Sequence, residues 1–368
     1  MATSASRAGD TPAPGRRGGS RHIDYLDYFR GIAILCVVMI HASNAILNRG
    51  VVRVNDGFDP VRTGFDLLGR GATVYFALIS AIAFAHVMHR KAYSEYLRSR
   101  FFAVIVPYVV VTIALTLALA GRGGLDPAVV AELPERIGRN ILLGKAWNTL
   151  WYIPVIAILY VLSPLLLRLV NTRALTWLAV LLALLPLVVS RTGTTITPQM
   201  IVYFAGVYIV GLAVGRDVDR WVCAIASKWR WFAVAAIASV LTICLLDIAD
   251  FDTLGHTSLV GSAFYVFRLS SAGLILVALK DHVGKIPVAG ARFLKLAATY
   301  SFGIYFVHGP LLRPIAKAVG GTIPPDQPAW ALVAGAVFTF VLGLALSIAI
   351  VALVRKIAGR WSRQLIGS

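Results

Sequence analysis

The chain contains 368 residues, of which 58% are hydrophobic and only 14% are charged. Because soluble globular domains contain about 25% charged residues, this composition excludes an ordinary soluble enzyme and indicates one polytopic membrane domain. The formal net charge is +18, but the basic residues lie in short gaps between long apolar runs, which argues against a nucleic-acid-binding protein.

In chain order, residues 1–22 are rich in Ser, Gly, Pro and Arg and predict a disordered basic cytoplasmic tail. Residues 23–357 predict one all-α membrane domain, and residues 358–368 predict a short basic cytoplasmic tail. A membrane-spanning helix needs about 20 mostly apolar residues. Ten segments qualify, with the fifth and sixth short: 29–47, 67–88, 101–120, 148–167, 174–190, 199–215, 231–247, 260–279, 294–312 and 329–354.

Ten spans place both termini on the same side of the membrane. If that side is the cytoplasm, the inner segments contain 22 Lys and Arg residues and the outer segments contain 11; the remaining two of the 35, Arg30 and Arg268, lie within spans. This two-fold bias satisfies the positive-inside rule, so we predict cytoplasmic N- and C-termini. The longest gap, 121–147, is too short for a separate domain and predicts one amphipathic surface helix.

The first span carries polar residues, which are costly in a bilayer and mark candidate functional positions. Arg30 and His41 are 11 residues apart. This spacing corresponds to about 16 Å of helix rise and three turns, so both side chains project from one face. Arg30 is expected near the cytoplasmic surface, and His41 near the midplane with Asn44 beside it. His41 can exchange a proton, act as a nucleophile or bind a metal, and a hydrogen-bonded core histidine is the alternative.

The ninth span carries a second histidine at a similar depth. His308 lies about 21 Å from the inner end of this span, and Tyr305 lies one turn below it on the same face. We expect His41 and His308 to face one cavity that is open to the outer leaflet. No carboxylate or cysteine stands at a spacing that would complete a metal site with them, and Cys36, Cys223 and Cys244 show no metal or redox spacing. We therefore predict no metal.

Two further arginines lie in or near spans, Arg70 at the outer end of the second and Arg268 within the eighth. Neither span offers an acid one turn away inside the membrane, although Asp66 precedes Arg70 at the boundary. A buried, unpaired guanidinium favours an anionic ligand or developing negative charge, whereas the alternative is a side chain that extends to the interface. The span interiors contain essentially no Asp or Glu, which argues against a proton- or sodium-coupled carrier.

Four stretches resemble the acyltransferase 3 family of bacterial integral-membrane acyltransferases. YLDYFRGIAILCVVMIHA at 25–42 is similar to the opening of the family and keeps its spacing of Arg, ten residues and His at Arg30 and His41. RGATVYFALIS at 70–80 resembles the second span, LWY at 150–152 with SPL at 163–165 resembles a middle segment, and SFGIYFVH at 301–308 resembles the Tyr-x-x-His signature. The resemblance covers residues 24–354.

The resemblance implies transfer of an acyl group, usually acetyl, from cytosolic acyl-coenzyme A to a hydroxyl of an extracytoplasmic or lipid-linked saccharide. The protein would then lie in the bacterial cytoplasmic membrane, use acyl-coenzyme A as a co-substrate and hold no permanent cofactor. The charges fit an anionic cytosolic donor, because the inner segments carry a net charge of +15 and the outer segments +1.

The residues expected to carry this reaction fall into three groups. Arg30, Arg98 and Arg100 border the inner entrance and are candidates for binding the donor phosphates. His41 would be the general base or a transient acyl carrier, two roles that the sequence leaves open. The remaining candidates for catalysis, oxyanion stabilisation or acceptor binding are His308, Tyr305, Arg70, Arg268, Asn44, Trp151 and Ser80.

Two other functions remain open on the sequence alone. The same helical architecture suits an exporter of polysaccharide or lipid that transfers no acyl group. It also suits a scaffold or sensor in envelope assembly. Expected partners are the acyl donor, the saccharide or glycolipid acceptor and membrane lipids, but not nucleic acid.

Overall fold

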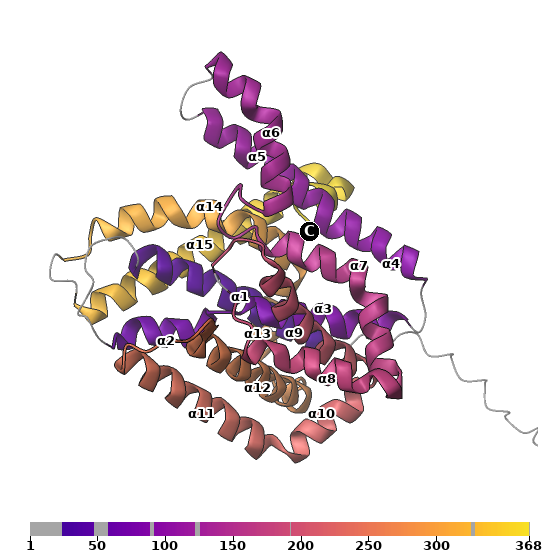
Figure 1. Cartoon of the computed structure of the whole chain (residues 1–368). Helices are drawn as coiled ribbons and strands as arrows, with labels where there is room; N and C mark the ends of the chain where they lie inside the picture. The colour runs from indigo at the N-terminus through magenta and orange to yellow at the C-terminus, as the bar shows by residue number, and fades with distance from the viewer. Residues whose placement is uncertain are drawn as a thin grey trace, which may run out of the picture.

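The computed structural model describes residues 24–47, 58–88, 92–121, 126–191, 193–324 and 328–367. The predicted tail at 1–22 lies outside these residues. Within them the protein is all-α apart from one two-stranded ribbon, as the sequence predicts (Figure 1).

The elements of the first half are α1 (Asp24–Leu47), α2 (Pro60–Gly69), α3 (Thr73–Met88), α4 (Tyr93–Arg100), the π-helical turn η1 (Phe101–Ile105), α5 (Val106–Gly121), α6 (Pro127–Leu143), α7 (Tyr152–Asn171), η2 (Arg173–Leu175), α8 (Thr176–Leu184) and η3 (Leu185–Leu187). Those of the second half are α9 (Pro198–Arg216), α10 (Val218–Ser227), α11 (Trp229–Ile248), β1 (Thr253–Leu254), β2 (Thr257–Ser258), α12 (Leu259–His282), α13 (Val288–Thr299), α14 (Ser301–Gly320), α15 (Ala329–Ala358), η4 (Gly359–Trp361) and α16 (Ser362–Ile366).

Eight helical segments of the described chain are long and apolar enough to cross a membrane. They are Tyr25–Leu47, Pro60–Val87, Tyr93–Gly121, Tyr152–Asn171, Pro198–Arg216, Trp229–Ile248, Leu259–His282 and Ala329–Ile366.

The other two of the ten predicted spans have a different form. The fifth corresponds to the short apolar segment Arg173–Leu187. Within it, α8 ends at Leu184 and a 3-10 turn follows, because Pro186 lacks the amide hydrogen that would continue the α-helix. The ninth is divided between α13 and α14. The protein is therefore a multi-pass membrane protein, and the count of ten spans stays a prediction.

Helix α1 occupies the middle of the bundle and packs against α2, α3, α12, α13, α14 and α15 (Figure 1). Its apolar side chains Phe29, Ala33 and Val38 are fully buried. At Gly31 a Cβ atom would lie 2.5 Å from the carbonyl oxygen of Leu294, so only glycine lets α13 approach this closely. The sequence singles out three polar residues on α1, and the packing holds all three on this central helix: Arg30, His41 and Asn44.

Helices α5 and α6 form a hairpin that projects from one end of the bundle (Figure 1). Helix α6 begins at the N-cap Asp126, followed by Pro127, and ends at Gly144 in the left-handed conformation (φ 64°). None of its residues is buried, which confirms the surface helix predicted in this gap. From Gly144 the chain runs back to the bundle and enters α7.

The predicted C-terminal tail is helical over most of its length. Helix α16 folds back against α5, and its residues Ser362 and Ile366 are buried. The last residues of the described chain therefore belong to the packed domain.

Candidate active site

The two histidines that the sequence places at similar depth lie side by side. The ring centroids of His41 on α1 and His308 on α14 are 5.3 Å apart. His308 is fully buried, and its Nδ1 lies 2.9 Å from the carbonyl oxygen of Ile304. A carbonyl only accepts, so in this bond Nδ1 carries the proton and a neutral imidazole has its lone pair on Nε2. Within the described chain Nε2 is buried without a partner, as a buried base would be.

A cavity of about 350 Å³ begins at His41. It lies between the last turns of α1, the segment that precedes α7, and α14. His308 is not in its wall but directly behind His41. The residues that line the cavity are His41, Asn44, Ala45, Trp147, Asn148, Thr149, Gly309, Leu312 and Arg313.

The segment that precedes α7 is held against α14 by two features. The hydroxyl of Tyr305 donates a hydrogen bond to the carbonyl oxygen of Thr149. At Gly309 a Cβ atom would lie 2.6 Å from Nε1 of Trp147, so glycine is required for this contact. Tyr305 is therefore already engaged through its hydroxyl, whereas the sequence placed it among the groups that could stabilise an oxyanion.

Arg268 lies in different surroundings from those expected, since it is absent from the cavity wall. Its side chain is buried, and its guanidinium donates to the carbonyl oxygens of Asp66 (3.1 Å), Leu67 (2.9 Å) and Arg70 (2.8 Å) and to the hydroxyl of Tyr75 (3.0 Å). These carbonyls belong to the end of α2, where a helix leaves acceptors unsatisfied. Arg268 thus caps α2, which corrects the expectation that it needs an anionic ligand.

Three other predicted residues lie outside the cavity wall. Arg70 is exposed, forms an ion pair with Asp66 (3.2 Å) and lies over the ring of Phe264 at 4.9 Å. Trp151 is buried beneath the guanidinium of Arg191, and Ser80 is half-buried on α3. Of the predicted acceptor or oxyanion residues, only Asn44 lines the cavity.

The predicted donor-binding arginines come from two helices, with Arg30 near the N-terminal end of α1 and Arg98 and Arg100 in the last turn of α4. Arg30 lies 3.8 Å from Asp27 and close enough to Arg100 for their charges to interact. Arg100 lies over Tyr96 at 5.1 Å, and its Nε is buried without a partner in the described structure. Arg98 is exposed on α4 and shares neither contact. The charges of Arg30 and Arg100 thus interact, whereas Arg98 is exposed, and donor binding by these arginines stays a prediction.

A file of tyrosine rings continues from Arg100 towards His308. The ring centroids of Tyr96 and Tyr160 are 5.9 Å apart. Tyr160 lies on α7, and Tyr152 lies two turns earlier on the same helix. The ring centroid of Tyr305 lies 6.4 Å from that of Tyr152 and 5.9 Å from that of His308. The hydroxyls of Tyr96 and Tyr152 are buried without partners among the described residues. Helix α7 therefore carries a tyrosine near the arginines and another near the histidines, each packed against further aromatic rings.

Sequence reasoning missed Arg191, Trp147 and Asn148. Arg191 lies between η3 and α9, with its guanidinium over the ring of Trp151 at 4.4 Å, and its charge acts on His41. Burial lowers the pKa of Arg191 from its ordinary value. The available signal was that Arg191 is the one basic residue of its outer gap, 191–198. Asn148 is a polar residue in an apparently apolar predicted span, and offered no pattern.

The two histidines have no third metal-ligating neighbour in the described ranges, where no group of three or more His, Cys, Asp or Glu residues occurs. The three cysteines are free. The absence of a metal stays a prediction.

Comparison with known proteins gives one result. A family model described as an acyltransferase domain, of the acyltransferase 3 type, matches residues 23–352. No curated protein and no solved structure matches the chain.

Proposed function

The chain belongs to the acyltransferase 3 family, as its motifs predict, and on this premise we propose that it transfers an acyl group, most simply acetyl, from cytosolic acyl-coenzyme A to a hydroxyl of an extracytoplasmic or lipid-linked saccharide. The observation that carries the proposal is the His41–His308 pair, with ring centroids 5.3 Å apart, behind a cavity at one end of α1. Near the other end of α1, the charge of Arg30 interacts with that of Arg100, which is on α4.

The donor reaches the protein at the arginines. Coenzyme A is strongly anionic, and guanidinium groups bind phosphates through charge-assisted, bidentate hydrogen bonds. The Lys and Arg bias of the sequence favours a cytoplasmic position for this end, and the proposal puts the protein in the bacterial inner membrane with both chain termini on the cytoplasmic side. Arg30 and Arg100 would hold the phosphates, and the acyl-bearing arm would have to reach His41 past the buried tyrosines of the core.

In a direct transfer, His41 accepts the proton of the acceptor hydroxyl while the oxygen forms a bond with the thioester carbonyl carbon. The carbon–sulfur bond then breaks, and the coenzyme A thiolate takes the proton from His41. The products are the ester and coenzyme A thiol. A positioned histidine contributes about 10²–10⁴-fold to such a step.

In a two-step transfer, a ring nitrogen of His41 bonds to the acyl carbon, the carbon–sulfur bond breaks, and coenzyme A leaves as the thiol with the proton of the His41 ring. The acceptor hydroxyl then bonds to the acyl carbon while its proton passes to a second base. The carbon–nitrogen bond to His41 breaks, and the base returns the proton to the His41 ring. The unpartnered Nε2 of His308 is a suitable base, since it lies beside His41 and carries a lone pair. The amides of Asn44 and Asn148 line the cavity and are candidates for binding the oxyanion in either route.

The test uses purified protein in mild detergent with acetyl-coenzyme A and a lipid-linked saccharide fraction. We expect coenzyme A release that depends on the saccharide and yields an acylated saccharide. Saccharide binding or movement without acylation, under conditions where the protein is folded, would favour the exporter and overturn the proposal.

A second measurement separates the two routes. Labelled coenzyme A is incubated with acetyl-coenzyme A and protein in the absence of acceptor. Appearance of label in acetyl-coenzyme A indicates the two-step route, because the first step is then reversible without acceptor. Transfer without such exchange indicates the direct route.

A further inference from the structure

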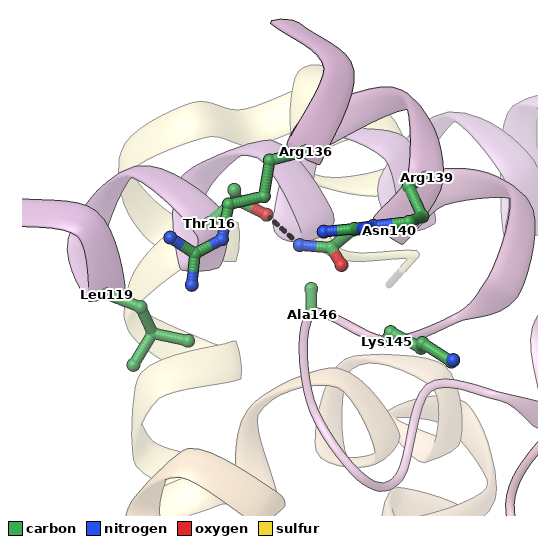
Figure 2. Close-up of a pocket in the computed structure, with 7 residues that line it drawn as sticks. All are labelled: Thr116, Leu119, Arg136, Arg139, Asn140, Lys145 and Ala146. Carbon is green, nitrogen blue, oxygen red and sulfur yellow. Dashed lines mark hydrogen bonds between the residues drawn. The ribbon is translucent and has the colours of Figure 1, made fainter. Parts of the chain in front are cut away.

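The α5–α6 hairpin contains a second cavity, of about 340 Å³, which the catalytic proposal does not use (Figure 2). Helix α5 supplies one wall, the last turns of α6 supply another, and the segment that leaves α6 closes it. Its lining residues are Thr116, Leu119, Arg136, Arg139, Asn140, Lys145 and Ala146.

Three of these seven residues are basic. Arg136 and Arg139 lie about one turn apart on α6, and Lys145 follows the helix end at Gly144. All three are exposed, and no ion pair joins them to a carboxylate within the described chain. The nearby acids of α6, Glu132 and Glu135, are not part of the lining. The cavity therefore presents three basic side chains that form no ion pair among the described residues.

A polar network fixes the floor of this cavity. The side-chain amide of Asn140 donates to Oγ1 of Thr116 at 3.0 Å, and that hydroxyl donates to the carbonyl oxygen of Thr112 at 2.7 Å. The hydroxyl of Tyr108 contacts the carbonyl oxygens of Asn140 and Ile141 at 3.2 and 2.6 Å. Figure 2 shows the side-chain oxygen of Asn140 turned away from Thr116, where it can accept a hydrogen bond. The hairpin thus holds its polar groups in place before any ligand arrives.

This basic cavity adjoins the His41 cavity through one short stretch of chain. Lys145 and Ala146 line the basic cavity, whereas the next three residues, 147–149, line the His41 cavity. Even fully extended, the chain from Lys145 to Asn148 spans no more than about 11 Å between Cα atoms. The linings of the two cavities are therefore about 11 Å or less apart at these residues, a distance that a ligand a few groups long would span.

We propose that the basic cavity binds a phosphate or diphosphate ester on the acceptor, so that a hydroxyl further along the same molecule reaches His41. This inference rests on the proposed function and names the acceptor as a phosphorylated, lipid-linked saccharide. The predicted topology places this hairpin on the outer side, where basic residues are otherwise few. Three of the four basic residues of the gap 121–147 line this one cavity.

The first experiment measures occupancy of the cavity rather than activity. Leu119→Cys is introduced into full-length protein that carries Cys223→Ser and Cys244→Ser, and an uncharged, membrane-impermeant maleimide modifies the introduced thiol. We expect inorganic pyrophosphate to slow this modification at least five-fold. The double substitution Arg136→Gln/Arg139→Gln should abolish the protection, because the guanidiniums are lost while the hairpin packing stays.

Arg62→Gln is the matched control, since Arg62 is also an exposed arginine of an outer segment but lines neither cavity. It should leave the protection unchanged. A thermal unfolding midpoint within a few degrees of the parent shows that each variant is folded. No protection in the parent, or equal protection in the double variant, would overturn the proposal.

A second arm distinguishes the acceptor from ordinary membrane lipid. The same modification is measured in phosphatidylcholine nanodiscs that contain either a polyprenyl diphosphate or phosphatidylglycerol at equal mole fraction. Protection by the polyprenyl diphosphate alone supports the proposal. Equal protection by phosphatidylglycerol would assign the cavity to a lipid headgroup and overturn the acceptor assignment.

The last arm measures transfer. Arg136→Gln/Arg139→Gln should raise the KM for a phosphorylated acceptor at least ten-fold and leave the KM for acetyl-coenzyme A unchanged. If parent protein transfers no acyl group at all, the proposed function fails, while the protection experiments still decide what the cavity binds. If transfer occurs and the double variant keeps the parental acceptor KM, the further inference alone fails.

Discussion

Arg268 and His308 are both buried polar residues on apolar helices, yet their surroundings differ. Arg268 satisfies three carbonyl oxygens near the end of α2 and donates to Tyr75. His308 uses Nδ1 for the carbonyl of Ile304 and keeps Nε2 free beside His41. A buried polar group in a membrane helix can thus stabilise the fold or take part in chemistry. The hydrogen-bond partners that the fold supplies distinguish the two roles.

The largest effect is expected at His41, the residue of the pair that faces the cavity. His41→Ala should abolish acyl transfer while membrane insertion and the thermal unfolding midpoint stay close to those of the parent. The side chain faces a polar cavity rather than a packed core, so its loss removes chemistry and not structure. Acyl transfer by the purified variant in proteoliposomes provides the measurement. Parental turnover would remove the histidine pair from the mechanism.

His308→Asn tests whether the free Nε2 is used. Asparagine keeps a donor near the position of Nδ1, which preserves the bond to Ile304, but it removes the second ring nitrogen. We expect turnover to fall by about 10²–10⁴-fold, as for loss of a general base, with little change in stability. His308→Gln places an amide near the position of Nε2 and serves as the comparison. A large loss of stability with unchanged turnover per folded molecule would make His308 structural, like Arg268.

Arg268→Leu should act on the fold. Removing the guanidinium takes the donor away from buried acceptors near the end of α2, which costs about 1–3 kcal/mol of stability for each group left unsatisfied. The midpoint of thermal unfolding in mild detergent should fall, whereas the KM values of the remaining folded protein should not change. A selective rise in acceptor KM at parental stability would return Arg268 to the acceptor site.

The smallest of these effects is expected at Arg30. Arg30→Ala removes one charge-assisted contact, worth about 1.5–3 kcal/mol, so the KM for acetyl-coenzyme A should rise roughly ten- to a hundred-fold. Initial rates at varied donor concentration measure it, and Arg98→Ala is the matched control because Arg98 is exposed and apart from Arg30 and Arg100. An unchanged donor KM with a lower kcat would instead place Arg30 at the reacting atoms.

The sequence predicts the fold class because long apolar runs require helices in a bilayer, where every backbone polar group must be satisfied internally. It also predicts a similar depth for the two histidines, since counting residues along helices gives their depth, but of the two only His41 lines the cavity that both were expected to face. The broken ninth span was not predicted in this way, because counting apolar residues does not report a break such as the one at Tyr300 between α13 and α14.

For the same reason, the sequence predicts the candidate site only in part. Arg268 looked unpaired because its acceptors are backbone carbonyls, which no side-chain pattern reports. Arg191 and Asn148 come from segments between helices, and their positions near His41 depend on how those segments fold back over the bundle. The Tyr305 contact with Thr149 likewise joins residues 156 positions apart.

The measurement that most directly tests the account uses wild-type protein in proteoliposomes of known orientation. Labelled acetyl-coenzyme A is supplied only on the side of Arg30 and Arg100, and lipid-linked saccharide acceptor is accessible only from the side of the His41 cavity. The account predicts acylated acceptor on the cavity side, with coenzyme A released on the arginine side. Transfer that occurs only when both substrates share one side, or acceptor movement without acylation, would contradict it.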